Sequence, residues 1–150
     1  MERTLILAKP DAVQRGLVGE LIGRLERRGL RIAGLKFMRV SRATAEEHYK
    51  EHSAKPFFAG LVEYITACPI VALAMEGPNA VDIARATIGA TNPANATPGS
   101  IRGDLAVSIG RNLIHGSDSL ASAKRELDLF FGIDELFDYQ RSAEPWIFES

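Results

Sequence analysis

The chain has 150 residues, of which 46% are hydrophobic and 25% charged, as expected of a globular domain large enough to bury a core. A net charge of −1 gives no general basic field, so bulk attraction to nucleic acid or to an anionic membrane is not indicated. The single cysteine, Cys68, excludes an intrachain disulfide and a cysteine-cluster metal site. No apolar run is long enough for a signal peptide or a membrane span. We therefore expect one soluble, cytoplasmic domain over residues 1–150.

The N-terminal part of the chain predicts a strand, a helix and a second strand. Residues 4–8 are apolar and β-compatible, and Pro10 ends this strand. Apolar residues then recur at helical spacing over residues 17–25, and Gly29 supplies a C-terminal stop. Residues 30–40 predict the second strand.

Two helices and a buried strand are predicted next. Thr44-Ala-Glu-Glu47 fits a capping box that begins a helix reaching about His52. Pro56 opens a further helix, which Pro69 ends. The continuous apolar run over residues 70–75 predicts a central strand buried on both faces.

The rest of the chain contains a helix, a long loop, a short strand and a last helix. The pattern predicts a helix over residues 79–88, a strand over residues 113–115 and a last helix over residues 119–131. Residues 90–111 show neither helical nor strand periodicity. A loop of this length in a compact domain is usually functional or disordered, and its prolines favour a stiff, functional loop. Residues 133–150 have no clear period.

The order of these elements indicates the fold class. The sequence β-α-β-αα-β-α-β consists of two split βαβ halves with an inserted helical hairpin, which matches the ferredoxin-like pattern. We therefore predict an α+β ferredoxin-like βαββαβ sandwich with a four-stranded antiparallel sheet. The helices are expected on one face, with the helical hairpin before the third strand and the long loop before the last. No internal repeat, low-complexity segment or linker is visible.

The stretch Asn112-Leu-Ile-His-Gly-Ser-Asp118 carries the strongest indication of chemistry. Leu113 and Ile114 predict a short buried strand that brings His115 to its end, and Gly116 removes side-chain bulk beside the ring. An imidazole held on such a rim is accessible and fixed in orientation, as a nucleophile must be. A purely structural histidine at a strand end is the alternative that this stretch leaves open.

Polar residues gather at the predicted element ends and in the long loop. Cations and hydroxyl groups of this kind, converging on one histidine, suit a polyphosphate. There is no Walker motif and no Rossmann fingerprint, so discrete side chains rather than a glycine cradle would hold a nucleotide. Each residue alone could instead belong to a solvated face, an ion pair or packing. The set comprises Lys9, Tyr49, His52, Arg85, Thr91, Arg102, Asn112, His115, Ser117 and Glu126.

Five separated motifs resemble those of nucleoside diphosphate kinases, in the same order and over nearly the whole chain. They are Leu7-Ala-Lys-Pro-Asp-Ala-Val-Gln-Arg-Gly-Leu-Val-Gly19, Lys55-Pro-Phe-Phe-Ala-Gly-Leu61, Gly89-Ala-Thr-Asn-Pro93, Pro98-Gly-Ser-Ile-Arg-Gly-Asp104 and Gly110-Arg-Asn-Leu-Ile-His-Gly-Ser-Asp-Ser119. Two departures are mild. Ile109 stands where the family often has valine, and Ala12 where glycine is also common.

The resemblance implies an activity and a catalytic group. Family members transfer the γ-phosphate of a nucleoside triphosphate, typically ATP, to a nucleoside diphosphate by a ping-pong mechanism with broad base and sugar tolerance. His115 would be the nucleophile that forms a phosphohistidine. Glu126, helped by Ser117, would orient its ring, and Tyr49 would lie close to it.

The resemblance also implies how the nucleotide and its metal are held. The phosphates would bind side chains of the long loop and the helices, namely His52, Arg85, Thr91 and Arg102. The sugar hydroxyls would bind Lys9 and Asn112, and the base would stack on Phe57 in an apolar slot with Leu61 and Ile109. Stacking accepts any base, because every base has a π-face. Mg²⁺ would be bound mainly through the phosphates, with Asp118 reaching it through water.

Assembly is a further implication of the resemblance. The family forms hexamers or tetramers that are built from common dimers. The tail ending Trp146-Ile-Phe148 is similar to that of hexameric members, and Pro93 lies in the loop that those members use at trimer contacts. We expect a homo-hexamer, with a tetramer as the alternative, that requires neither a membrane nor nucleic acid.

Functions of other classes are the competing hypotheses. A ferredoxin-like domain can be a non-catalytic nucleotide-binding or RNA-binding module, because the fold serves many functions. Such a module has no need of both His115 and Glu126, and an RNA-binding sheet would expose aromatics on its central strands, where Phe37 is the only one. A protein-histidine kinase or phosphate relay would reuse His115 but discriminate against free diphosphates.

Overall fold

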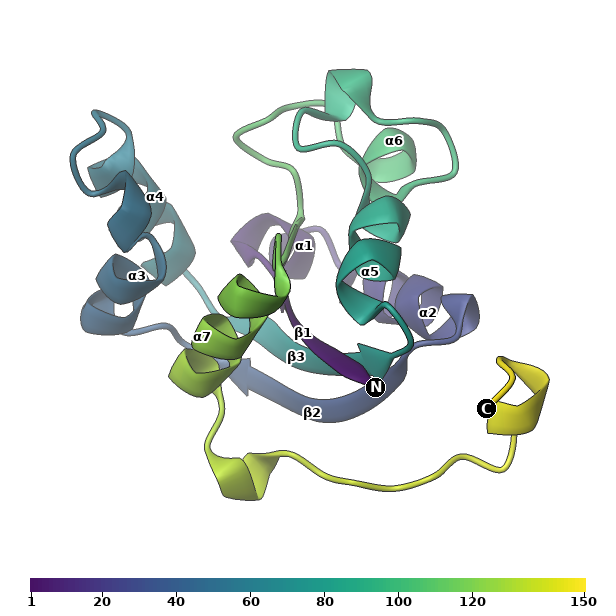
Figure 1. The fold of residues 1–150 in the computed structure, drawn as a ribbon. Coiled ribbons are helices and arrows are strands. Elements are labelled where there is room, and N and C mark those ends of the chain that lie inside the picture. Colours follow the sequence, from purple (N-terminus) through teal and green to yellow (C-terminus); the bar gives the residue numbers. More distant parts are fainter.

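A computed structural model describes residues 1–150 and shows the predicted α+β fold around a four-stranded antiparallel sheet (Figure 1). The strands are β1 (Glu2–Ala8), β2 (Arg31–Met38), β3 (Ile70–Gly77) and β4 (Ile114–Gly116), in the order β2-β3-β1-β4. β1 pairs with both β3 and β4, and Leu7 lies opposite His115. The central strand therefore fixes the register of the short strand that carries the predicted nucleophile.

Seven α-helices and four 3-10 turns complete the chain. The helices are α1 (Pro10–Gln14), α2 (Val18–Arg28), α3 (Arg42–His48), α4 (Phe58–Thr66), α5 (Ala80–Ile88), α6 (Ile101–Leu105) and α7 (Leu120–Phe130). The 3-10 turns are η1 (Lys50–His52), η2 (Pro93–Asn95), η3 (Ile133–Glu135) and η4 (Glu144–Trp146).

The helices cover both faces of the sheet, so the prediction of helices on one face is wrong. α2 and α5, the helices of the two split βαβ halves, share a hydrophobic cluster with Ile6 and Ala8 of β1. α3, α4 and α7 share a second cluster with Leu5 and Leu7 on the opposite face. Because successive strand residues point to opposite faces, the unbroken apolar run of β1 requires a helical layer on each side.

Most helix boundaries follow the local signals in the sequence. Gly29 ends α2 with a φ of 114°, the left-handed conformation that glycine adopts without penalty. Ser119 caps α7, since its hydroxyl accepts a hydrogen bond from the backbone N–H of Ser122 at 3.0 Å. The predicted capping box at Thr44 is wrong: Ser41 caps α3 by accepting from Thr44, and the helix ends at His48.

The long loop before β4 is an ordered unit with structure of its own. It contains η2 and the short helix α6, neither of which the sequence predicts. Ser100 caps α6, because its hydroxyl accepts a hydrogen bond from the backbone N–H of Gly103 at 3.0 Å. β4 begins at Ile114, one residue later than predicted, since Leu113 has a φ of 73° that no strand accommodates.

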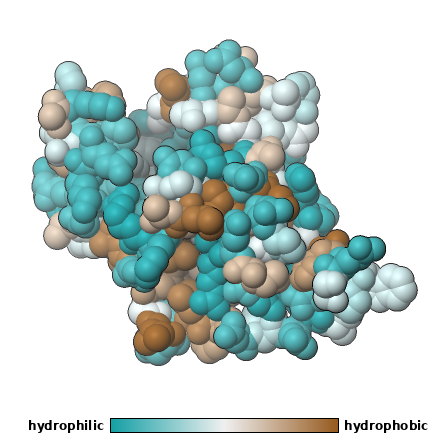
Figure 2. Space-filling model, in the orientation of Figure 1, coloured by the Kyte–Doolittle hydropathy of each residue, from teal (hydrophilic) through white to brown (hydrophobic).

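Several large apolar side chains remain exposed on the isolated chain. Phe37 on β2 is 66% exposed, Ile133 in η3 is 93% exposed, and Trp146 in η4 is 91% exposed. Figure 2 shows separate hydrophobic patches on a largely hydrophilic face. None of the helices combines the length and the apolarity that a membrane span requires.

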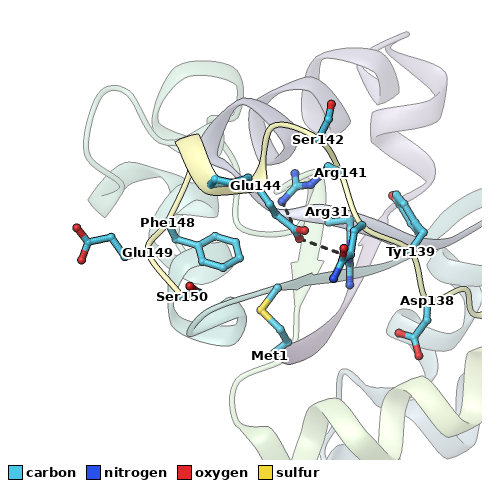
Figure 3. Close-up of a pocket in the computed structure, with 12 residues that line it drawn as sticks. Met1, Arg31, Asp138, Tyr139, Arg141, Ser142, Glu144, Phe148, Glu149 and Ser150 are labelled. Atoms are coloured by element: carbon cyan, nitrogen blue, oxygen red, sulfur yellow. Dashed lines mark hydrogen bonds and ion pairs between the residues drawn. The ribbon is translucent and has the colours of Figure 1, made fainter.

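The C-terminal tail crosses the outer edge of β2. The backbone N–H of Phe137 donates to the carbonyl of Ala33 at 2.9 Å. Further along, Glu144 lies 3.4 Å from Arg31 of β2 and 3.8 Å from Arg141, and Figure 3 shows its carboxylate between the two arginines. Backbone and ionic contacts thus hold a segment that has no strand and only single 3-10 turns.

Candidate active site

A cleft of about 660 Å³ is lined by residues of the α3–α4 hairpin, the long loop and β4. Figure 1 shows the course of these segments. The walls of the cleft bring together every predicted site residue except Ser117, whose hydroxyl is buried behind it. These lining residues are Lys9, Tyr49, His52, Phe57, Leu61, Arg85, Thr91, Arg102, Ile109, Asn112, His115, Asp118 and Glu126. Segments far apart in the sequence therefore converge on one site.

The ring of His115 is held from one side by Glu126 on α7. Its Nε2 atom lies 3.0 Å from Oε1 of Glu126, and the buried Ser117 hydroxyl donates to the same oxygen at 2.6 Å. This contact occupies Nε2, and Nδ1 makes no hydrogen bond within the chain. The second ring nitrogen is thus the one available to a ligand in the cleft.

The ionisation of Glu126 fixes the tautomer of this ring. Burial alone would raise the pKa of Glu126, but hydrogen bonds and attraction from His115, with a further hydrogen bond from Ser117, lower the pKa to about 2. The carboxylate is therefore ionised at neutral pH and accepts the proton on Nε2. In the neutral imidazole, that leaves the Nδ1 lone pair free.

His48 on α3 is a site residue that the sequence analysis missed. Its ring centroid lies 4.9 Å from that of His115, with the rings nearly perpendicular at 86°. Burial lowers the pKa of His48 to about 3, so this ring is neutral and adds no charge beside His115. Its position directly before Tyr49, inside the helix predicted from Thr44 to about His52, was the only signal that could have identified it.

The site offers two different kinds of metal ligand. His48, His115 and Glu126 have ligand atoms within 4.8 Å of one another. Two imidazoles and one carboxylate suit a zinc-class ion, whereas Mg²⁺ prefers oxygen ligands and keeps several waters. The exposed carboxylate of Asp118, which lines the same cleft, fits Mg²⁺ better. An Mg²⁺ that arrives with phosphates needs few protein ligands beyond this one.

The arginines of the cleft are held rigidly by backbone carbonyls. The buried guanidinium of Arg102 donates to Gly89 at 3.0 Å, to Asn112 at 3.2 Å and to Ile114 at 2.6 Å. Burial, and then repulsion from Arg85, lower the pKa of Arg102 to about 10. Two cations that repel each other at the wall of a cleft favour an anion between them.

Lys9 extends this positive wall at the end of β1. Its ammonium donates to the side-chain oxygen of Asn112, whose amide in turn donates to the carbonyl of Thr91 at 2.9 Å. Burial and then the nearby Arg102 lower the pKa of Lys9 to about 8. The lysine is therefore a cation at neutral pH that titrates just above it.

The mouth of the cleft is apolar and exposed. Phe57 is 51% exposed and Ile109 is 59% exposed, with Leu61 beside them in the lining. The ring of His52 lies 5.5 Å from that of Phe57, and the ammonium of Lys55 lies 5.6 Å from the Phe57 centroid. Such a slot offers an aromatic face to a planar ligand.

Relatives of the chain share one family and one fold. The family model for nucleoside diphosphate kinase matches residues 2–136. Proteins named nucleoside diphosphate kinase are 55% identical over 149 residues in Archaeoglobus fulgidus, with 99% of each chain covered, and 58% identical over 147 residues in Thermomicrobium roseum, with 98% of this chain and 99% of the relative covered.

Solved structures with the same fold carry the same name. A halophilic nucleoside diphosphate kinase from Halobacterium salinarum, in complex with CDP, is 49% identical with a TM-score of 0.96 over 99% of both chains. A nucleoside diphosphate kinase family protein from Babesia bovis is 41% identical with a TM-score of 0.96 over 99% of this chain and 100% of the other. The chain therefore belongs to the nucleoside diphosphate kinase family and is a phosphotransferase between nucleoside triphosphates and nucleoside diphosphates.

Proposed function

We propose that His115 carries the transferred phosphate on Nδ1 between two half-reactions. In the first, the Nδ1 lone pair attacks the γ-phosphorus of a nucleoside triphosphate, and the bond to the β–γ bridging oxygen breaks. In the second, a β-phosphate oxygen of the acceptor diphosphate attacks the same phosphorus, and the imidazole leaves. The observation that carries the proposal is the contact of Nε2 with Glu126, since it directs Nδ1 to the cleft.

Arg85 and Arg102, with Thr91 and His52, are proposed to hold the phosphates. Phosphoryl transfer depends mainly on positioning and on electrostatic stabilisation of the transferred group. Mutual repulsion of the two arginines disappears when a polyphosphate neutralises them, which supports their assignment to this role. Tyr49, whose pKa burial raises to about 12, stays protonated beside the reacting histidine as a neutral hydroxyl donor.

The sugar and the base are proposed to occupy the outer part of the cleft. The hydrogen-bonded pair Lys9 and Asn112 suits the sugar hydroxyls, and Phe57 suits the base. An aromatic face makes no hydrogen bonds to the edge of a base, so purine and pyrimidine nucleotides should both be accepted. The CDP complex of the Halobacterium salinarum relative supports this for a pyrimidine diphosphate.

Mg²⁺ is the proposed metal, held through the phosphates with Asp118 at a water-mediated distance. When bound, the ion would supply positive charge that offsets the negative charge on the phosphates during transfer. Asp118 is exposed and belongs to the cleft lining, which suits an indirect ligand.

We further propose that residues 1–150 form one catalytic domain of a cytoplasmic homo-oligomer. A hexamer is expected, with a tetramer as the alternative. The exposed Phe37, Ile133 and Trp146 support assembly, because burying large apolar side chains at a subunit contact is favourable. Sedimentation velocity measures the oligomeric state directly, and a tetramer would contradict the expected hexamer.

Labelling of the enzyme tests the proposed nucleophile. Incubation with γ-labelled ATP and Mg²⁺ should yield a phosphoenzyme that is labile in acid and stable in base, as expected of a phosphoramidate. His115→Ala should abolish the label, whereas His52→Ala, which removes another histidine of the cleft, should leave a labelled enzyme. Label that survives His115→Ala would move the nucleophile elsewhere. Nucleotide binding without any turnover would favour the non-catalytic module.

A further inference from the structure

Leu113 adopts a backbone conformation that L-residues rarely occupy. Its φ is 73°, and the backbone N–H of Ile114 donates to the carbonyl of Asn112 across it at 2.9 Å. A hydrogen bond between residues i and i+2 around such a φ defines a γ-turn of the rare, strained form. Strain of this kind persists only where the surrounding structure over-determines it. The turn separates Asn112, proposed for the sugar, from His115.

The turn is held by groups from other parts of the chain. Oδ2 of Asp11, on α1, accepts a hydrogen bond from the backbone N–H of Leu113 at 3.0 Å. The backbone N–H of Lys9 donates to the Leu113 carbonyl at 2.8 Å. Arg102 binds the carbonyls on either side of the turn. Asp11 is thus the only side chain that satisfies the backbone N–H of the strained residue.

A tyrosine fixes the carboxylate of Asp11. The hydroxyl of Tyr64, on α4, donates to the other oxygen, Oδ1. Burial, and then the hydrogen bond to Asp11, raise the pKa of Tyr64, so the phenol remains a donor at any physiological pH. The guanidinium of Arg111 lies 4.6 Å from the ring centroid and packs over it. Neither Asp11 nor Tyr64 lines the cleft, so neither touches a bound substrate directly.

We propose that Asp11, held by Tyr64, is a positioning residue for phosphoryl transfer. It keeps the γ-turn at Leu113, which aims the side chains of Asn112 and His115 into the same cleft from adjacent stretches of chain. Without it, the peptide at Leu113 relaxes to an ordinary φ and the two side chains lose their relative placement. This inference rests on the proposed function, because it assumes that His115 carries the phosphate.

The test compares variants that keep or remove the oxygen that accepts the hydrogen bond from the backbone N–H of Leu113. Asp11→Ala removes both acceptors, whereas Asp11→Asn retains one carbonyl oxygen. The single-turnover rate of His115 phosphorylation should fall roughly 100-fold in Asp11→Ala, the loss expected from a displacement of about 1 Å. Asp11→Asn should recover most of that loss. KM should rise less than kcat falls, since Arg85, Thr91 and Phe57 lie outside the turn.

Asp104→Ala is the matched control. Asp104 also accepts a backbone hydrogen bond, from Gly99 at 2.8 Å, and lies on α6 outside the cleft lining. This variant should lose thermal stability comparably while it keeps the phosphorylation rate. Equal rate losses in Asp104→Ala and Asp11→Ala would overturn the inference, because they would show a general structural effect.

A double-mutant cycle separates the two partners. Tyr64→Phe should slow the phosphorylation of His115 in the parent chain. In a chain that already carries Asp11→Ala, it should cause no further loss of rate. If Asp11→Ala does not fold, Tyr64→Phe in the parent chain replaces the cycle, and a parent-like phosphorylation rate there would overturn the inference. A parent-like rate in both Asp11 variants, with the label still abolished by His115→Ala, would refute this inference alone. Label that survives His115→Ala would instead refute the proposed function.

Discussion

The back wall of the cleft and its mouth are built in opposite ways. At the wall, the His115 ring is fixed by the buried carboxylate of Glu126, which Ser117 holds in turn. At the mouth, Phe57 and Ile109 are more than half exposed. The wall sets the direction of one nitrogen, while the mouth only offers a surface. This contrast separates the chemistry, which needs fixed geometry, from base recognition, which we propose to be broad.

The largest effect should follow from a change in the wall. Glu126→Ala removes the acceptor that fixes the His115 tautomer, so kcat should fall roughly 1000-fold with little change in KM, by analogy with other oriented histidines. Steady-state kinetics with ATP and a diphosphate acceptor measure both constants. Glu51→Ala, which removes another carboxylate of the cleft lining, is the control and should alter kcat by less than about twofold. A similar kcat loss in both variants would contradict the contrast.

A change at the mouth should act on binding instead. Phe57→Ala removes the stacking face, which is worth about 1–3 kcal/mol per base, so KM should rise roughly 30-fold. The increase should be similar for purine and pyrimidine diphosphates, since the ring contacts no base edge. The two series of acceptors are compared under identical conditions. A fall in kcat with unchanged KM would show that the mouth takes part in the chemistry.

The lowered pKa of Lys9 predicts a pH effect of intermediate size on kcat/KM. Because burial lowers its pKa to about 8, the free enzyme loses this cation as the pH rises through 8. The ratio kcat/KM, which reports free-enzyme ionisations, should be constant below that pH and fall up to about tenfold by pH 9. Lys9→Gln should lower kcat/KM at neutral pH and remove this inflection. An inflection that survives the substitution would assign it to another group.

The smallest effect should come from Ile109→Val. The change removes one methylene from a side chain that is 59% exposed, so it deletes little buried area and should change KM by less than about twofold. A larger change, or one restricted to purines, would show that the slot discriminates by shape. Measured KM values for ADP and CDP decide between these outcomes.

Signals that act within one turn of chain predicted the fold well. Gly29, Pro69 and Ser119 end or begin elements where their backbone and hydrogen-bonding properties require it. The element order then predicted the four-stranded antiparallel sheet. The continuous apolar run Leu5-Ile6-Leu7-Ala8 also carried the information that both faces are covered, but the fold analogy favoured one covered face.

Features that depend on tertiary contacts escaped the sequence analysis. A leucine has no local preference for the φ of 73° found at Leu113, which exists because Asp11 and Arg102 bind around it. α6 is too short for a detectable period. His48 looks like any apolar-face histidine until α7 brings Glu126 beside it. The gathering of the predicted site residues in one cleft was predictable only through the resemblance, since each residue alone had a structural alternative.

The tail that crosses β2 has a consequence beyond its ionic contacts. β2 is the end strand of the sheet, and its unpaired carbonyls could recruit a strand from another molecule. Phe137 and Tyr139 donate hydrogen bonds to two of them, at Ala33 and Ile32. Phe137 and Tyr139 therefore occupy two hydrogen-bond acceptors of the sheet edge that a strand of another molecule would otherwise need.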